Sequence, residues 1–272
     1  MAERAARLAE TIARDFYGGQ GLKLPGQQPR RWEESREVTV VEELRDRGAG
    51  DRGIRLFLTF VAAMSRDRDF KQLLDAALAL FQTDPELYEP AEVTQVHPEA
   101  IRDRLREAKV SRKHGPDSDA WCAIARSLTQ PGPMATAINE GEGDAKRLLW
   151  ELDALADGRP RYPLLKGDKS GPLWLGWLAA LGSADLDSLD FVPVAVDTHI
   201  RKVSKALRVV DADEETKDRI VDPAIRAAWL AAVEGTEVEG PAGAVGTCAA
   251  LNAPLWLLGK HGWCCYMHLV QE

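Results

Sequence analysis

Apolar residues recur at helical intervals along most of the chain. Leu8, Ile12 and Phe16 stand four positions apart, so they share one face of a helix. The stretch 54–64 is apolar almost throughout, which indicates a buried helix. Similar patterns predict further helices at 69–82, 98–108, 118–127, 144–156 and 223–233.

Strand signals, by contrast, are sparse. The β-branched stretch 191–196 contains Pro193, which favours an extended connection over a paired strand. The pattern therefore predicts an all-α fold. With 272 residues and 45% hydrophobic content, the chain is long enough to bury a full core, as one large domain or as two packed lobes.

Signals for export or membrane insertion are missing from the sequence. No apolar run approaches the roughly 20 residues that span a bilayer. The stretch 1–16 is charged and amphipathic, without the apolar core of a signal peptide. The cysteines are few, and the vicinal pair Cys264 and Cys265, with Cys122 and Cys248, suits a disulfide framework poorly. We expect a cytoplasmic protein with reduced thiols.

The overall charge is acidic. The net charge is −8 and the pI is about 5.3, which argues against a surface that binds nucleic acid everywhere. Binding to phosphates needs only a local group of the 35 Lys and Arg residues. The positions of these cations therefore matter more than their number.

The segment 164–172 reads as a tight turn that leads into a buried helix. Pro172 suits the first helical position, and Gly182 suits the cap after the last turn. Backbone amides at this helix start, next to Lys166 and Lys169, would form a phosphate site. The alternative is an ordinary turn between helices with two solvated lysines.

A second segment, 191–208, brings an extended chain to an aspartate. Asp197 can cap a helix that begins at Thr198. Its simplest role is that of an N-cap, and His199 would then be a polar residue of the first turn. Arg201, Lys205 and Arg208 follow at helical spacing; they predict a basic face for phosphates, or else a solvated face. The C-terminal stretch 252–268 mixes aromatic and polar groups in the way that a base pocket or a packed final helix would, through Trp256, Lys260, His261, Trp263 and Tyr266.

These two segments together resemble the endonuclease III branch of the helix-hairpin-helix DNA glycosylases. The resemblance covers about 54–208 and is strongest at 194–207, where Val-Asp-Thr-His opens a basic helix. Gly167-Asp168-Lys169 resembles in part the hairpin of archaeal 8-oxoguanine glycosylases. The resemblance implies two helical lobes, 54–189 with the hairpin and 1–53 plus 190–272, with a DNA cleft between them and Asp197 at its edge.

The resemblance also implies a mechanism. Such enzymes flip a nucleotide out of duplex DNA and cut its base–sugar bond, which builds positive charge on the sugar. Asp197 would stabilise that charge or activate water, and the helix dipole would stabilise its anion. By the same resemblance, contacts with DNA are expected from Lys166, Gly167, Lys169, Ser170, Gly171, Arg201, Lys205, Ser65 and Arg66. A base pocket is expected from Trp174, His199 and Trp263, although tryptophans on the predicted helices, Trp121, Trp150, Trp174 and Trp177, more often pack in a core.

The sequence departs from this family at the catalytic lysine. Bifunctional members carry it at the start of the helix after the hairpin, where this chain has Gly171 and Pro172. We therefore expect a monofunctional enzyme that uses water. The alternative is a glycosylase with lyase activity in which Lys169 takes that role.

Cofactor and partners follow from the same comparison. The cysteines lack the spacing that holds a [4Fe–4S] cluster in many relatives, so we expect no cofactor and no metal. We expect a monomer, associated with the nucleoid, that acts on double-stranded DNA. Three alternatives remain: a non-catalytic DNA-binding module, a relative that processes modified thymidines by another reaction, and a helical scaffold. The sequence leaves the excised base open.

Overall fold

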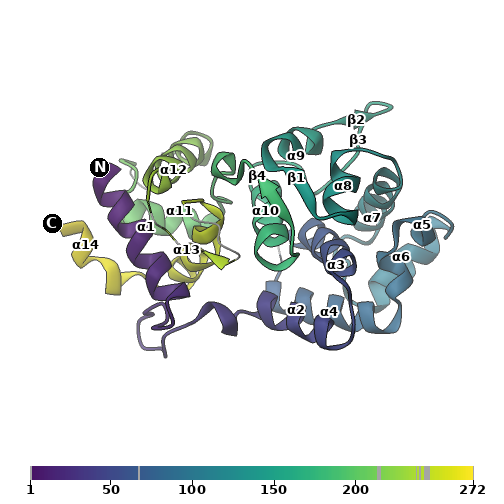
Figure 1. The fold of residues 1–272 in the computed structure, drawn as a ribbon, viewed down its shortest axis with the longest axis horizontal. Helices are drawn as coiled ribbons and strands as arrows, with labels where there is room; N and C mark the ends of the chain where they lie inside the picture. The colour runs from purple at the N-terminus through teal and green to yellow at the C-terminus, as the bar shows by residue number, and fades with distance from the viewer. Residues whose placement is uncertain are drawn as a thin grey trace. The chain divides into compact units, whose positions relative to one another are not determined.

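The computed structural model describes residues 2–66, 68–212, 216–236, 238, 240–241 and 246–271. This part of the chain is mostly α-helical, as the sequence predicts, with four short strands (Figure 1). None of its helices is long and apolar enough to cross a membrane. Contacts divide the chain into two compact units: unit 1 is Met1–Ser35 with Ser188–Glu272, and unit 2 is Arg36–Asp187.

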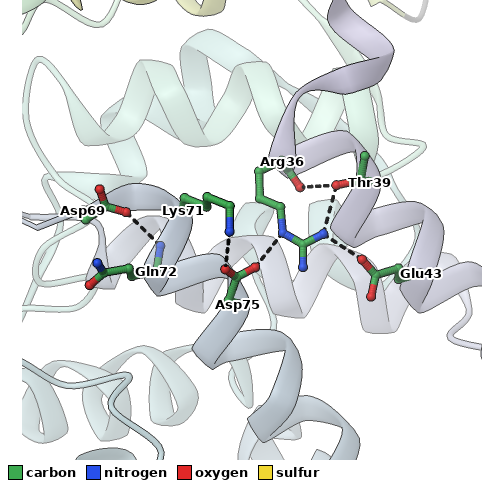
Figure 2. A network of polar contacts seen from close by, with 7 residues as sticks. All are labelled: Arg36, Thr39, Glu43, Asp69, Lys71, Gln72 and Asp75. Carbon is green, nitrogen blue, oxygen red and sulfur yellow. Dashed lines mark hydrogen bonds and ion pairs between the residues drawn. The ribbon is translucent and has the colours of Figure 1, made fainter.

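The first boundary lies earlier than the predicted change of lobe at 53/54. The helix α2 (Arg36–Asp46) belongs to unit 2 because it packs against α4 (Phe70–Thr83). Arg36 joins the two helices: its guanidinium bonds to Glu43 at 2.7 Å and to Asp75 at 2.6 Å (Figure 2). Lys71 shares the Asp75 carboxylate at 2.8 Å. A search for apolar periodicity does not detect ion pairs such as these, and the pattern did not predict α2.

Unit 1 is built around the N-terminal helix. Its elements are α1 (Ala2–Tyr17), η1 (Trp32–Glu34), η3 (Leu189–Phe191), α11 (Thr198–Ala206), α12 (Asp218–Val233), α13 (Ala249–His261), η5 (Cys264–Tyr266) and α14 (His268–Gln271). Leu8, Ile12 and Phe16 are fully buried, which confirms the predicted stripe. They face α12 and α13, and α13 also packs against α11.

Unit 2 surrounds the buried helix α3 (Asp51–Met64). The remaining helices are η2 (Pro85–Tyr88), α5 (Pro90–Val93), α6 (Pro98–Glu107), α7 (His114–Leu128), α8 (Pro133–Asn139), α9 (Ala145–Leu152) and α10 (Ser170–Leu181). Strand β1 (Glu142–Asp144) pairs in parallel with β4 (Asp185–Asp187), and β2 (Leu155–Ala156) pairs antiparallel with β3 (Arg159–Pro160). Helix α3 packs against α4, α7, α8 and α10, so its apolar run is buried on all sides, as predicted.

A buried arginine ties three helices of unit 2 together. Arg55 on α3 is 5% exposed, and its guanidinium donates to the carbonyl of Ile138 at 2.8 Å and of Asn139 at 3.2 Å, at the end of α8. It also donates to the Gly182 carbonyl at 3.1 Å, just after α10. The last carbonyls of a helix lack partners within the helix and carry partial negative charge. Arg55 satisfies them without a carboxylate, and its burial lowers its pKa.

Several helix ends differ from the predicted ones. Helix α9 stops at Leu152, because the chain turns into the β2–β3 ribbon where a helix to 156 was expected. Helix α12 begins before Pro223, at Asp218. Helix α10 begins at Ser170, so Pro172 is its third residue and not its first, whereas Gly182 caps its end as predicted.

Candidate functional site

Asp197 is anchored at the start of α11, as its cap pattern predicts. Its Oδ1 accepts the amide hydrogens of His199 and Ile200, each at 2.9 Å. No described residue donates a hydrogen bond to Oδ2, and the residue is half-buried. The carboxylate is therefore oriented by one oxygen, while its other oxygen accepts no hydrogen bond from the residues that the structure describes.

The chain that enters α11 is fixed to α13. The Ala195 amide donates to Oδ1 of Asn252, a buried α13 side chain, at 2.8 Å. Farther along α13, Gly259 lies against the His199 backbone, so closely that a Cβ on Gly259 would be 2.1 Å from the His199 carbonyl oxygen. Only glycine allows this approach. Two contacts thus hold α13 against the first turn of α11, on either side of Asp197.

Along this close packing, aromatic and basic side chains of α11, of α13 and of the residues after α13 meet. The rings of His199 and Trp256 meet edge to face, with centroids 5.4 Å apart. The Lys260 ammonium lies 4.5 Å from the Trp256 ring centroid, and the Lys202 ammonium lies 5.2 Å from that of Trp263. Such cation–π contacts orient the cation over the aromatic face. We call this surface the α11–α13 face; it comprises Asp197, His199, Lys202, Trp256, Lys260 and Trp263.

His261 lies at the end of α13, next to this face. Its Nδ1 is 3.1 Å from Nε2 of Gln27. Burial lowers the pKa of His261, and the positive charges of Lys260 and Arg30 lower it further. The imidazole is therefore held toward its neutral form. The sequence pattern had singled out His261 with Trp256, Lys260 and Trp263, but it had not indicated Lys202, whose ring partner follows α13.

The predicted basic stripe on α11 does not form. Arg201 is bound within unit 1: its Nε and Nη2 donate to Asp222 of α12 at 2.7 and 2.9 Å, and its Nη1 lies 3.2 Å from Asp218. The bond to Asp222 is the main cause of its raised pKa. Arg208 lies beyond the end of α11 with φ of 52°, so it leaves the helical face. Lys205 stays on α11 and is half-buried.

The residues of the predicted phosphate site lie at the start of α10, in unit 2. Gly167 is exposed, with φ of 103°, and its carbonyl accepts the Gly171 amide at 3.3 Å. Ser170 and Gly171 are buried; a Cβ on Gly171 would meet Leu152 and Leu149 of α9 at 3.0 and 3.1 Å. Two residues expected to touch phosphate therefore pack inside unit 2.

The two lysines of this segment differ in setting. Lys166 is exposed, and its ammonium lies 3.7 Å from Oδ1 of Asp153. Lys169 is half-buried at the cap position of α10, where its side chain makes no capping bond.

Three other predicted residues lie elsewhere in unit 2. Trp174 is fully buried, and its indole N–H donates to Oγ1 of Thr59 at 2.9 Å. This corrects its assignment to a base pocket, because a buried ring has no face for a base. Ser65 follows α3 and donates its hydroxyl to the Ala62 carbonyl at 2.8 Å, and Arg66 beside it is exposed.

The cysteines are free thiols in two different units. Cys122 belongs to unit 2 and the other three to unit 1. Cys248 is buried, and burial raises its pKa to about 12. Within the described ranges, no group of three or more His, Cys, Asp or Glu side chains could hold a metal ion.

The α11–α13 face thus combines an anchored carboxylate with two tryptophans and two lysines. A carboxylate stabilises positive charge in a transition state, aromatic rings stack on planar groups, and ammonium groups attract phosphates. No family model matches the chain, and comparisons with curated proteins and with solved structures found no match.

Proposed function

We propose that the protein is a DNA glycosylase in which Asp197 is the catalytic carboxylate. The anchoring of Asp197 through Oδ1 alone is the observation that carries the proposal. A group that is oriented before the reaction stabilises developing charge without reorganising. With Oδ1 held by two amides, Oδ2 is the atom that would face the sugar or the attacking water.

The neighbouring side chains suit an extruded nucleotide of double-stranded DNA. Trp256 and Trp263 are half-buried, which is typical of rings that stack on a base while their edges pack in the protein. Lys202 and Lys260 would meet the flanking phosphates. In this proposal the protein acts as a monomer, and water attacks the sugar carbon after the base–sugar bond weakens.

The test is base release from duplexes that carry a panel of damaged and modified bases. Asp197→Asn is the informative variant, because asparagine caps a helix as well as aspartate does, has nearly the same size and carries no negative charge. We expect base release to fall by about 100- to 1,000-fold, measured as alkali-labile sites. Asp144→Asn is the matched control, since Asp144 caps α9 in the same way, accepting the Arg147 amide at 2.7 Å. Unchanged release by Asp197→Asn would exclude the assignment.

A different result would favour a non-catalytic role. If no duplex loses a base or is otherwise changed while DNA binding persists, the protein is a DNA-binding module and not an enzyme. The panel should include modified thymidines, with products identified by mass spectrometry, because another reaction at the same residues would leave no abasic site.

Lyase activity through Lys169 is the second candidate. Its half-buried position before α10, with no capping bond from the side chain, leaves the amine unengaged by the helix start. A lysine nucleophile forms a Schiff base that borohydride traps. An adduct present in the wild type and absent in Lys169→Gln would establish this role.

A further inference from the structure

Unit 2 exposes two large apolar side chains in consecutive elements. Trp150 on α9 is 67% exposed and Leu155 on β2 is 59% exposed; no other large apolar side chain of unit 2 is as exposed within the described residues. Only four residues separate Trp150 from Leu155 in the chain, and exposed apolar groups that form one patch commonly mark a binding surface. The expectation that Trp150 packs in a core, drawn from its place on a predicted helix, is wrong because the residue is 67% exposed.

The ribbon that carries Leu155 is a tight hairpin with hydrogen bonds at its base. Asp157 and Gly158 both have positive φ, 52° and 74°, which is the type I′ turn that Asp-Gly favours in a two-residue hairpin. At its base, the Arg161 amide donates to the Ala154 carbonyl at 3.1 Å. The Arg161 carbonyl accepts the Ser127 hydroxyl at 2.9 Å. Figure 1 shows the β2–β3 ribbon as a projection beyond the end of α9.

The charges around this surface favour a nucleic acid. Lys146 places its ammonium 5.4 Å from the Trp150 ring centroid. Arg147 and Arg159 are exposed, and their guanidinium groups bond to none of the described residues.

Two neighbouring carboxylates each lie near a cation. Glu151 pairs with Arg161 at 2.6 Å, and Asp153 lies 3.7 Å from Lys166. Asp157, at the tip of the ribbon, is a further exposed carboxylate. Aromatic and apolar groups interleaved with cations are the composition that stacks on bases and binds phosphates.

We propose that Trp150 and Leu155 form a second DNA-contacting surface, which rests on the proposed function for its substrate. Leu155, on the projecting β2–β3 hairpin, enters between base pairs of the duplex, and Trp150 packs against the nucleotide beside it. Arg147 and Arg159 bind the flanking phosphates. The surface grips distorted duplex and takes no part in the chemistry at Asp197.

The test is duplex binding by the full-length protein, measured by fluorescence anisotropy at several salt concentrations. Trp150→Ala and Leu155→Ser should each weaken binding about tenfold. Arg159→Gln should weaken binding a few-fold. It should also make the slope of log affinity against log salt shallower by about the contribution of one phosphate contact. Ile220→Ser and Arg219→Gln are matched controls, because both residues are exposed on α12 of unit 1; they should leave the affinity unchanged.

The outcomes separate this surface from the proposed function. Unchanged affinity in Trp150→Ala and Leu155→Ser overturns the surface even when Asp197→Asn abolishes base release. Weakened affinity supports the surface even when no duplex loses a base. The wild type could sediment as a dimer and Trp150→Ala as a monomer whose DNA affinity is unchanged. In that case the surface binds a second copy of the chain and the proposal fails.

Discussion

The starts of α10 and α11 look alike in sequence, yet they differ in what the protein does with them. Both follow a non-helical segment and both carry lysine or arginine nearby. At α11, the Asp197 side chain caps the helix and stays half-buried. At α10, no side chain caps the helix, and Ser170 and Gly171 are buried against α9. The start of α11 presents an oriented carboxylate, whereas the start of α10 mainly packs against α9.

A glycine permits close packing at each of these starts, and substituting it gives the largest expected contrast. A Cβ on Gly259 would meet the His199 carbonyl at 2.1 Å, and backbone cannot move aside. A Cβ on Gly171 would meet only the ends of leucine side chains, at 3.0 and 3.1 Å. We expect Gly259→Ala to lower the free energy of unfolding by about 3 kcal/mol and Gly171→Ala by about 1 kcal/mol.

Urea unfolding followed by circular dichroism measures both changes. Gly115→Ala is the control, because a Cβ at Gly115, in α7, meets no atom within 4 Å. It should leave stability unchanged or raise it slightly. Equal losses in Gly259→Ala and Gly171→Ala would show that α11 and α13 separate easily, which contradicts a rigid α11–α13 face.

The cations beside the two starts give a smaller contrast. Arg201 binds both oxygens of Asp222 and its side chain is 17% exposed, so Arg201→Gln leaves a half-buried carboxylate with a weaker partner. We expect a loss of about 2 kcal/mol. Lys166→Gln removes a 3.7 Å contact between exposed groups and should cost less than about 0.5 kcal/mol.

Thermal melts at low and high salt check this pair. The melting temperature of Arg201→Gln should fall at both salt concentrations, because the ion pair is shielded from solvent. If Lys166→Gln lowers the melting temperature more than Arg201→Gln does, the start of α10 does not mainly serve to pack against α9.

The smallest expected effect is a difference between the wild type and His261→Gln in how stability changes with pH. The folded protein lowers the pKa of His261, mainly by burial, so it binds a proton less readily than the unfolded chain does. The stability from this site is present above the unfolded pKa, near 6.5, and is lost as the pH falls toward the lower folded pKa. His261→Gln should therefore lose less stability than the wild type between pH 7 and pH 5. Melting temperatures across this range test it, and a steeper loss in the variant would contradict the sign.

Local patterns predicted those features that depend on neighbours in sequence. The stripe of Leu8, Ile12 and Phe16 predicted α1, and the position of Asp197 before a polar first turn predicted its cap. The Asp157-Gly158 pair is also a local signal, typical of a two-residue hairpin, and it could have placed the β2–β3 ribbon. These signals work because backbone conformation and capping involve residues only a few positions apart.

Features set by distant partners were not predictable. The basic spacing on α11 gave no sign that Asp218 and Asp222 would bind Arg201 from another helix. The helical position of Trp150 did not reveal which side of α9 faces solvent. The pairing of Gly259 with the His199 backbone depends on how two helices cross, and a single sequence carries no local pattern for that.

The buried guanidinium of Arg55 has a consequence for how unit 2 assembles in time. Its carbonyl partners lie 83 to 128 positions away in the chain, at the end of α8 and after α10. A chain that buries α3 before those ends arrive would leave an unsolvated cation, which is costly. We therefore expect the core of unit 2 to close late in folding and in one step. We expect α3, α8 and α10 then to open together, so that hydrogen exchange gives their amides one shared free energy of opening.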